Sequence, residues 1–240
     1  MKLKAVVLGW EGKEERARAI AMQLRDQADS VRLTYSTRGS DIVIPGVEGI
    51  RVPSEAYFGG KFAQSIREWG DEAMLLVHAD TSAADWPEVA AACGRALSSP
   101  PIKVWAPEID VTPWPTALVQ FEQSSTSSYL AVAHTDAIVL GLAPDVVQRL
   151  RKLDYRENNL GWGVDWVALC YTYANNGIAV RDRSVAIRHD PGSGYPPQEA
   201  ARQMDAFLRQ MTLTEHIQYR FLDSMIEARR RHLRRTSGTT

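Results

Sequence analysis

Three polar segments of this 240-residue chain combine acidic residues, histidine and glycine in patterns that could do chemistry. The first, His78-Ala79-Asp80, directly follows an apolar run, so that its carboxylate leaves the core and faces solvent. A carboxylate placed there can hold Mg²⁺ or Mn²⁺ against the diphosphate oxygens of a nucleotide. Aspartate is also common in turns and helix caps, so an ordinary strand-end turn is the alternative.

The second segment is Gly161-Trp162-Gly163-Val164-Asp165. Two glycines let the backbone bend and approach a ligand closely, and tryptophan offers a flat apolar face to a sugar ring. Asp165 falls in the first turn of a predicted helix, where the helix dipole keeps a carboxylate ionised and available as a general base. The alternative is a helix start with a core tryptophan.

The third segment, His189-Asp190-Pro191-Gly192-Ser193-Gly194-Tyr195, follows a predicted strand and is rich in glycine. Such a loop can present backbone N–H groups to phosphate, and the neutral imidazole of His189 can bind a metal ion. A surface loop with a hydrogen-bonded histidine is the alternative.

Strands and helices must bring these segments together. The spacing predicts a strand at 3–8, a helix at 14–28 and a strand at 31–35, the βαβ signature of a parallel sheet. The apolar run 73–77 predicts a central strand, and nucleotides bind where such strands end. The residues at these predicted ends are Leu8, Gly9, Trp10, Tyr35, Ser36, His78, Ala79 and Asp80.

The middle of the chain changes character. Prolines separate short extended segments predicted at 102–106, 116–121 and 128–133, which indicates antiparallel or mixed sheet. We therefore expect an α/β fold: one domain over 1–200, with a Rossmann-like parallel half and then a mixed-sheet half, and a helical extension over 201–240. The remaining predicted elements are strands at 137–140, 178–180 and 185–188, and helices near 145–153, 164–175, 198–212 and 214–233.

Composition excludes several protein classes. With 45% hydrophobic and 24% charged residues, the chain is neither disordered nor a low-complexity fibre. Cys93 and Cys170 are isolated in apolar helical patterns, which predicts buried free thiols and no zinc site or disulfide framework. The sequence contains neither a signal-peptide pattern nor an apolar stretch of the ~20 residues that span a membrane, so we expect a cytoplasmic location.

In this order and on this fold, the three segments resemble the GT-A glycosyltransferases, in particular the family-2-like enzymes and the galactosyltransferases. The resemblance covers roughly residues 3–196 and is strongest from 137 onward. It implies a UDP- or GDP-sugar donor, Mn²⁺ or Mg²⁺ held by Asp80 and His189, and Asp165 as the base of an inverting transfer. Implied donor contacts are Leu8, Gly9, Trp10, Glu11, Tyr35, Ser36, Lys61, His78, Ala79, Asp80, Ser193 and Tyr195, and implied acceptor contacts are Gly161, Trp162, Gly163 and Asp165.

The chain departs from the family pattern at two positions. His78 stands where the family usually has the first aspartate of its Asp-x-Asp motif, a position that commonly contacts the nucleotide. Thr34-Tyr35-Ser36 replaces the acidic residue that reads the base or ribose, which leaves base specificity open. Lys61 resembles the family's basic position before the central strand, with a solvated lysine as the alternative.

The end of the chain is strongly basic. Five arginines and no acidic residue lie between 228 and 240. The net charge of the whole chain is −1, so the net charge of the remaining residues is −6. A solvated face is one interpretation; contact with an anionic membrane or with nucleic acid is the other. The acceptor is accordingly a saccharide, a lipid-linked sugar or a modified nucleobase, and the oligomeric state is open. A nucleotidyltransferase and a non-catalytic nucleotide- or sugar-binding module are the alternative functions.

Overall fold

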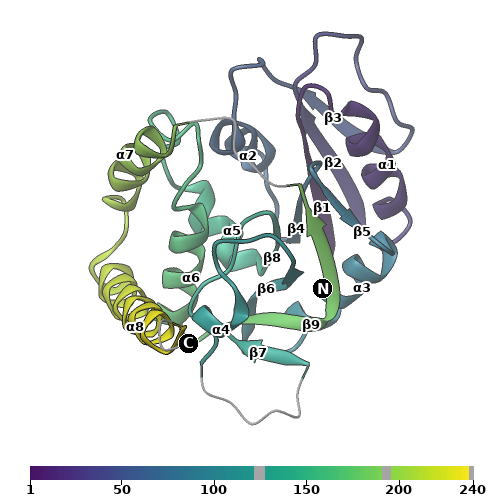
Figure 1. The fold of residues 1–240 in the computed structure, drawn as a ribbon. Helices are drawn as coiled ribbons and strands as arrows, with labels where there is room; N and C mark the ends of the chain where they lie inside the picture. The colour runs from purple at the N-terminus through teal and green to yellow at the C-terminus, as the bar shows by residue number, and fades with distance from the viewer. Residues whose placement is uncertain (122–127, 191–195, 238–240) are drawn as a thin grey trace.

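The computed structural model describes residues 1–121, 128–190 and 196–237, which form a nine-stranded sheet between two groups of helices. Helices α1 (Glu14–Leu24) and α3 (Trp86–Leu97) lie on one side of the sheet (Figure 1). On the other side lie α2 (Phe58–Ile66), α5 (Pro144–Arg151) and α6 (Val164–Ala174). Both layers share one hydrophobic core with the sheet.

The first half of the sheet is parallel. Its strands are β1 (Leu3–Gly9), β2 (Ser30–Tyr35), β3 (Val47–Arg51) and β4 (Ala73–His78), in the spatial order β3-β2-β1-β4. Every residue of β4 is buried, as expected for a central strand covered on both faces. Because the four strands are parallel, their carboxyl ends meet at one edge, and the predicted Rossmann-like half is confirmed.

The second half is mixed, as predicted. β8 (Val139–Leu142) runs antiparallel to β4 and to β6 (Ile102–Ile109). β9 (Ile178–His189) runs parallel to β6 and antiparallel to two three-residue strands, β5 (Thr81–Ala83) and β7 (Tyr129–Ala131).

Two sequence-based predictions of elements are wrong. The extended segment expected at 116–121 is largely a short helix, α4 (Thr116–Val119), because Leu118 and Val119 reach the core from one helical turn that follows Pro115. The two strands expected at 178–180 and 185–188 are parts of the single strand β9. The polar residues between them do not end the strand, because residues 183–185 of β9 bulge out opposite Pro107 and Glu108 and the pairing with β6 resumes at Ala186.

The two cysteines are buried and free, as predicted. Asp85 caps α3 by accepting a hydrogen bond from the backbone N–H of Glu88 at 3.1 Å.

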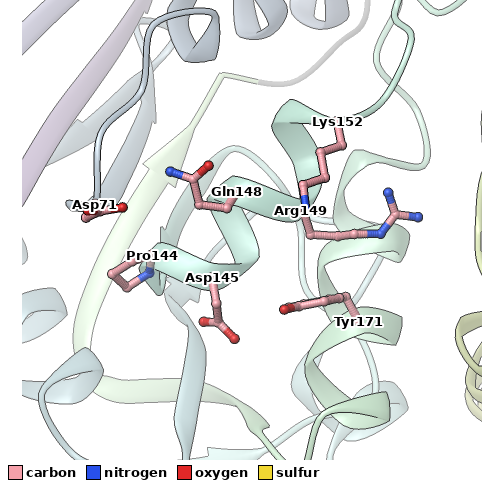
Figure 2. Close-up of a pocket in the computed structure, with 7 residues that line it drawn as sticks. All are labelled: Asp71, Pro144, Asp145, Gln148, Arg149, Lys152 and Tyr171. Carbon is pink, nitrogen blue, oxygen red and sulfur yellow. The ribbon is translucent and has the colours of Figure 1, made fainter.

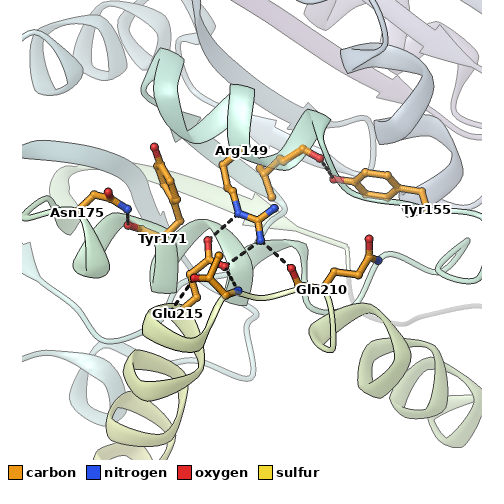
Figure 3. Close-up of polar contacts among 8 residues, drawn as sticks. Arg149, Tyr155, Tyr171, Asn175, Gln210 and Glu215 are labelled. Carbon is orange, nitrogen blue, oxygen red and sulfur yellow. Dashed lines mark hydrogen bonds and ion pairs between the residues drawn. The ribbon is translucent and has the colours of Figure 1, made fainter.

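Two C-terminal helices, α7 (Pro197–Leu208) and α8 (Leu213–Ser237), pack against this body, with Phe207, Leu222 and Ile226 in the common core. Arg149 of α5 holds α8 in place (Figure 3). Its guanidinium donates to both carboxylate oxygens of Glu215, at 2.7 and 2.8 Å, and to the carbonyl of Gln210 at 2.9 Å. Glu215 also accepts from the backbone N–H of Thr212, which completes a capping box at the start of α8.

None of the helices in the described ranges combines the length and the apolar character needed to cross a membrane. The division into a domain over residues 1–200 and a helical extension over residues 201–240 stays a prediction.

We expect Glu215→Gln to destabilise the protein by about 3 kcal/mol, because it leaves a largely buried guanidinium without its charged partner. Burial alone would raise the pKa of Glu215, but Arg149 outweighs burial and holds that pKa below its ordinary value of 4.5. The stabilisation is therefore complete above pH 4.5 and is lost as the pH falls through the lowered pKa. Urea unfolding across this pH range measures both effects.

The matched control is Glu199→Gln, which removes the carboxylate of an exposed ion pair with Arg202 on α7. We expect the control to change the unfolding free energy by less than about 1 kcal/mol. Equal effects of the two variants would contradict the anchoring role of Glu215.

Candidate functional site

The carboxyl ends of β1, β2 and β4 gather an aromatic and basic cluster. The ring of Trp10, just after β1, meets the ring of His78 edge-on at 5.6 Å between centroids. The Nζ of Lys61, from α2, lies 4.7 Å from the centre of a Trp10 ring and donates to the Ser36 hydroxyl at 3.0 Å. Phe58, one turn earlier on α2, contacts the other end of the cluster, 4.9 Å from the His78 ring.

Lys61 is buried, with 1% of its surface exposed, which excludes the solvated lysine. Burial lowers its pKa to about 8, against the opposing charge of Glu11. Glu11 itself pairs with Arg38 at 3.0 Å and accepts a hydrogen bond from Ser54. A partly desolvated ammonium beside an indole ring is suited to an anionic ligand.

Four other residues named for donor contact have structural roles at this edge. Leu8 and Ala79 lie fully in the core. Gly9 is required by packing, because a Cβ there would lie 2.9 Å from the Cβ of Tyr35. The Tyr35 hydroxyl accepts from the backbone N–H of Ile42 at 3.0 Å and so holds the loop after β2. Donor contact by these residues stays a prediction.

Asp80 and His189 face each other, with 3.7 Å between Oδ2 and Nε2. Strand β5 begins directly after Asp80, and its pairing with β9 sets Thr81 opposite His189. The next residue, Asp190, donates its N–H to the Asp80 carbonyl at 3.0 Å. The Asp190 carboxylate accepts from Lys13 at 2.7 Å and from Arg16 at 2.8 Å, which ties the end of β9 to the first turn of α1.

Ser193 and Tyr195, the two loop residues named for donor contact, lie outside the described residues.

The chemistry of the Asp80–His189 pair fits a divalent cation. The Nδ1–H of His189 donates to the Val111 carbonyl at 3.1 Å, which in the neutral ring leaves the Nε2 lone pair directed at Asp80. The Oδ1 of Asp80 is buried and has no hydrogen-bond partner. Burial alone would raise the pKa of Asp80, but His189 and His78 outweigh it and lower that pKa, so the carboxylate is ionised at neutral pH.

Within the described ranges, no three His, Cys, Asp or Glu side chains converge into a metal-binding group. The pair would therefore supply two ligands, and phosphate oxygens and water the rest, as is usual for Mg²⁺.

The glycines around Trp162 are explained by backbone geometry. Gly161 and Gly163 have φ angles of +81° and +92°, in the left-handed region that favours glycine. A Cβ on Gly161 would also lie 2.4 Å from the Phe58 ring, since this loop packs on the start of α2. Trp162 is 37% exposed, which leaves ring surface open to solvent. An acceptor contact by these three residues stays a prediction.

Asp165 lies in the first turn of α6, where the sequence places it, and its Oδ1 accepts from the backbone N–H of Trp166 at 2.8 Å. Burial and the negative charge of Asp136 raise the pKa of Asp165 to about 7, so the expectation that the helix dipole keeps this carboxylate ionised is wrong. A carboxyl group with that pKa is well matched to general base catalysis near neutral pH.

Sequence reasoning missed His134 and Asp136, which lie beside Asp165. His134 is fully buried between Trp114 and Trp166, with ring centroids 4.0 and 4.2 Å away, and its Nε2 is 3.7 Å from Oδ2 of Asp165. Asp136 accepts from Thr112 at 3.0 Å, and its charge adds to burial in raising the pKa of Asp165. The pKa of His189 is raised mainly by Asp80, with Asp136 as a minor contributor.

A signal for these two residues was present in the sequence. His134-Thr135-Asp136 follows an apolar run with the same His-x-Asp spacing as His78-Ala79-Asp80.

A pocket of about 360 Å³ lies elsewhere, lined by Asp71, Pro144, Asp145, Gln148, Arg149, Lys152 and Tyr171 (Figure 2). Asp71 precedes the amino end of β4, whereas Asp80 follows its carboxyl end, so this pocket and the candidate site lie at opposite ends of the strand. None of the sequence-predicted site residues lines it.

We expect Asp136→Asn to lower the pKa of Asp165 from about 7 toward its ordinary value of 3.8, because the variant removes a neighbouring negative charge. Carbon-detected NMR titration of the aspartate carboxyl groups measures the shift. Asp145→Asn, in the first turn of α5, is the matched control and should leave the pKa of Asp165 unchanged. An unchanged pKa in Asp136→Asn would contradict the coupling.

Comparison with known proteins tests the fold. No protein-family model matches the sequence, and no curated protein matches it significantly. Solved structures do match. GalNAc-T7 with UDP, GalNAc and Mn²⁺ has a TM-score of 0.56 at 10% identity over 86% of this chain and 48% of that one. Mannosyltransferase PcManGT from Pyrobaculum calidifontis, with GDP-Man and Mn²⁺, has a TM-score of 0.59 at 11% identity. The match covers 100% of this chain and 76% of the mannosyltransferase chain.

A third match is a UTP-bound UGPase from Acinetobacter baumannii, with a TM-score of 0.51 at 12% identity over 92% of this chain and 99% of that one. This chain thus spans less than half of the GalNAc-T7 chain and about three quarters of the mannosyltransferase. At such identities the likeness shows the fold alone: the chain has the fold of these enzymes, which agrees with the GT-A-like fold that the sequence predicts.

Proposed function

We propose that this protein is a metal-dependent glycosyltransferase that moves a sugar from a UDP- or GDP-sugar to an acceptor hydroxyl group. The observation that carries the proposal is the Asp80–His189 pair, with 3.7 Å between its facing atoms at the carboxyl edge of the sheet. Trp10 and Lys61 lie at the same edge, and the charge of Asp136 helps to raise the pKa of Asp165. These are residue types that a donor site and a base would need.

The structural neighbours support the same class of donor. GalNAc-T7 binds UDP with Mn²⁺, and PcManGT binds GDP-Man with Mn²⁺. Both belong to the fold that this chain adopts, in which ligands bind beyond the carboxyl ends of parallel strands.

On the donor side, Asp80 and His189 would hold Mn²⁺ or Mg²⁺, whose charge stabilises the departing diphosphate. Lys61 adds a second positive charge at this edge, and Trp10 offers a ring face beside it. Burial lowers the pKa of His78 to about 4, so its ring is neutral at pH 7 and its unpartnered Nε2 is free to hydrogen-bond the nucleotide.

On the acceptor side, Asp165 accepts the proton of the attacking hydroxyl. Direct displacement at the anomeric carbon inverts its configuration. With a pKa of about 7, Asp165 is ionised in a useful fraction of molecules at neutral pH and is basic enough to take the proton. His134 lies 3.7 Å from the carboxylate without a hydrogen bond to it, and the partly exposed Trp162 would contact the acceptor.

We expect Asp165→Asn to reduce sugar transfer at least 100-fold while leaving affinity for the nucleoside diphosphate nearly unchanged, because an amide cannot accept the proton. In the unmodified protein, kcat/KM should rise with pH through an apparent pKa of about 7. Initial rates over a pH series measure both effects, with Asp145→Asn as the control. Unchanged turnover in Asp165→Asn would remove this residue from the mechanism.

We expect UDP or GDP to bind at least tenfold more tightly with Mn²⁺ than without it, and Asp80→Asn to abolish that difference. Calorimetric titration in the presence and absence of Mn²⁺ gives the affinities. Asp71→Asn, at the other end of β4, is the control and should retain the dependence on metal. Equal affinity with and without Mn²⁺ would count against the metal site.

A nucleotidyltransferase is the second candidate, and the UTP-bound UGPase with the same general fold favours it. Two incubations separate the candidates, one with a panel of nucleotide sugars and one with nucleoside triphosphates and sugar phosphates. A glycosyltransferase releases the nucleoside diphosphate, whereas a nucleotidyltransferase forms pyrophosphate from a nucleoside triphosphate and a sugar phosphate. A non-catalytic module binds a nucleotide but releases neither product.

A further inference from the structure

Helix α8 has an exposed apolar face. Leu213, Ile217 and Phe221 are 78, 57 and 60% exposed, respectively. Because they are spaced by four residues, they lie on one side of the helix. Figure 1 places α8 at the outer edge of the molecule, beyond α6. Three large apolar side chains exposed in a row on a surface helix indicate an interaction site.

The inward side of the same helix is already occupied. Leu222 and Ile226 are buried, the ring of Tyr219 lies 4.8 Å from that of Trp166, and Glu215 pairs with Arg149. The outward residues are therefore not needed to attach α8 to the rest of the protein.

The outward face continues into the basic end of the helix. Ser224, Ala228 and Arg231 follow Phe221 at helical spacing and are exposed. Arg220, Arg234 and Arg235 add further exposed positive charge. Among the α8 residues whose burial the structure describes, Glu227 has a side chain that is 41% exposed, and it pairs with Arg230.

We propose that this face of α8, formed by Leu213, Ile217, Phe221 and the arginines that follow them, docks on a lipid bilayer surface that carries anionic headgroups. A helix that exposes large apolar residues together with arginines can bury the apolar side chains at the boundary between headgroups and acyl chains. The arginines then meet the negative surface potential. Duplex nucleic acid would use the arginines but provides no apolar layer for leucine, isoleucine and phenylalanine.

Docking has a consequence for the candidate acceptor site. Arg230 lies 5.8 Å from a Trp114 ring, and Trp114 stacks on His134 beside Asp165. The basic end of α8 thus adjoins the aromatic cluster around the base, and docking would bring that cluster close to the headgroups. Docking on a membrane favours the lipid-linked sugar among the possible acceptors. This inference about the acceptor rests on the proposed function, whereas the docking proposal does not depend on it.

Co-sedimentation of the full chain with vesicles tests the proposal. We expect binding to phosphatidylcholine vesicles that contain phosphatidylserine and much weaker binding to phosphatidylcholine alone. Arg231→Ala with Arg234→Ala should weaken binding to the anionic vesicles roughly 30-fold, at about 1 kcal/mol for each arginine. Ile217→Ser with Phe221→Ser should weaken it at least tenfold, because burial of one large apolar side chain is worth about 1.5 kcal/mol or more.

The controls are Met22→Ser, an exposed apolar residue on α1, and Arg18→Ala with Arg67→Ala, two exposed arginines far from α8 in sequence. Both should bind vesicles like the unmodified protein, and thermal melts verify that every variant folds. Failure to sediment with anionic vesicles overturns the proposal. Binding to duplex DNA that depends on the arginines alone would also overturn the proposal. A dimer that the double variant Ile217→Ser with Phe221→Ser converts to monomers would overturn it as well. Release of diphosphate from nucleotide sugars is measured separately, so failure of docking and failure of the proposed function are distinguishable.

Discussion

The candidate site depends on the pairing of β9 with β5. β9 runs beside β6 through the second half of the sheet and ends against β5, where Thr81 lies opposite His189. Because side chains alternate between the two faces of a strand, a register shift of one residue would turn His189 away from Asp80. The bonds from Asp190 to the Asp80 carbonyl, to Lys13 and to Arg16 hold this register. Pairing β9 with β5 and assembling the Asp80–His189 pair are thus one structural event.

The polar groups left without partners gather in the same region. Among the buried side-chain atoms that lack a hydrogen bond in the described structure, most belong to Trp10, His78, Asp80, His134, Thr135 and Arg181. Buried polar atoms are ordinarily paired, because an unpaired one costs roughly 1–3 kcal/mol. Their concentration where Lys61 and Asp165 also have shifted pKa values is typical of a site prepared for a polar ligand.

Helix α8 connects this region to the molecular surface. Its inward residues anchor it through the Arg149–Glu215 pair and through contact of Tyr219 with Trp166, the neighbour of Asp165. The basic end reaches the ring of Trp114 on the other side of His134. A helix with one face in the core and the other apolar and basic is suited to contact two environments at once.

The sequence by itself determined the local features of this protein. The unbroken apolar run at 73–77 required a central strand, the Gly-Trp-Gly segment marked the start of a helix, and the isolated cysteines indicated free thiols. It also nominated Asp80, Asp165 and His189, because each follows a strand or opens a helix at an edge where ligands bind. These features follow from periodicity and backbone preference, which nearby residues specify.

Only the tertiary structure decided which distant residues meet. It turned the Tyr35 hydroxyl toward a loop, buried Lys61 beside Trp10, and kept β9 continuous across its polar middle. It also placed Asp136 where its charge acts on both His189 and Asp165. Strand order and helix crossovers set these contacts, and they depend on burial across the whole core, which no local pattern in the sequence encodes.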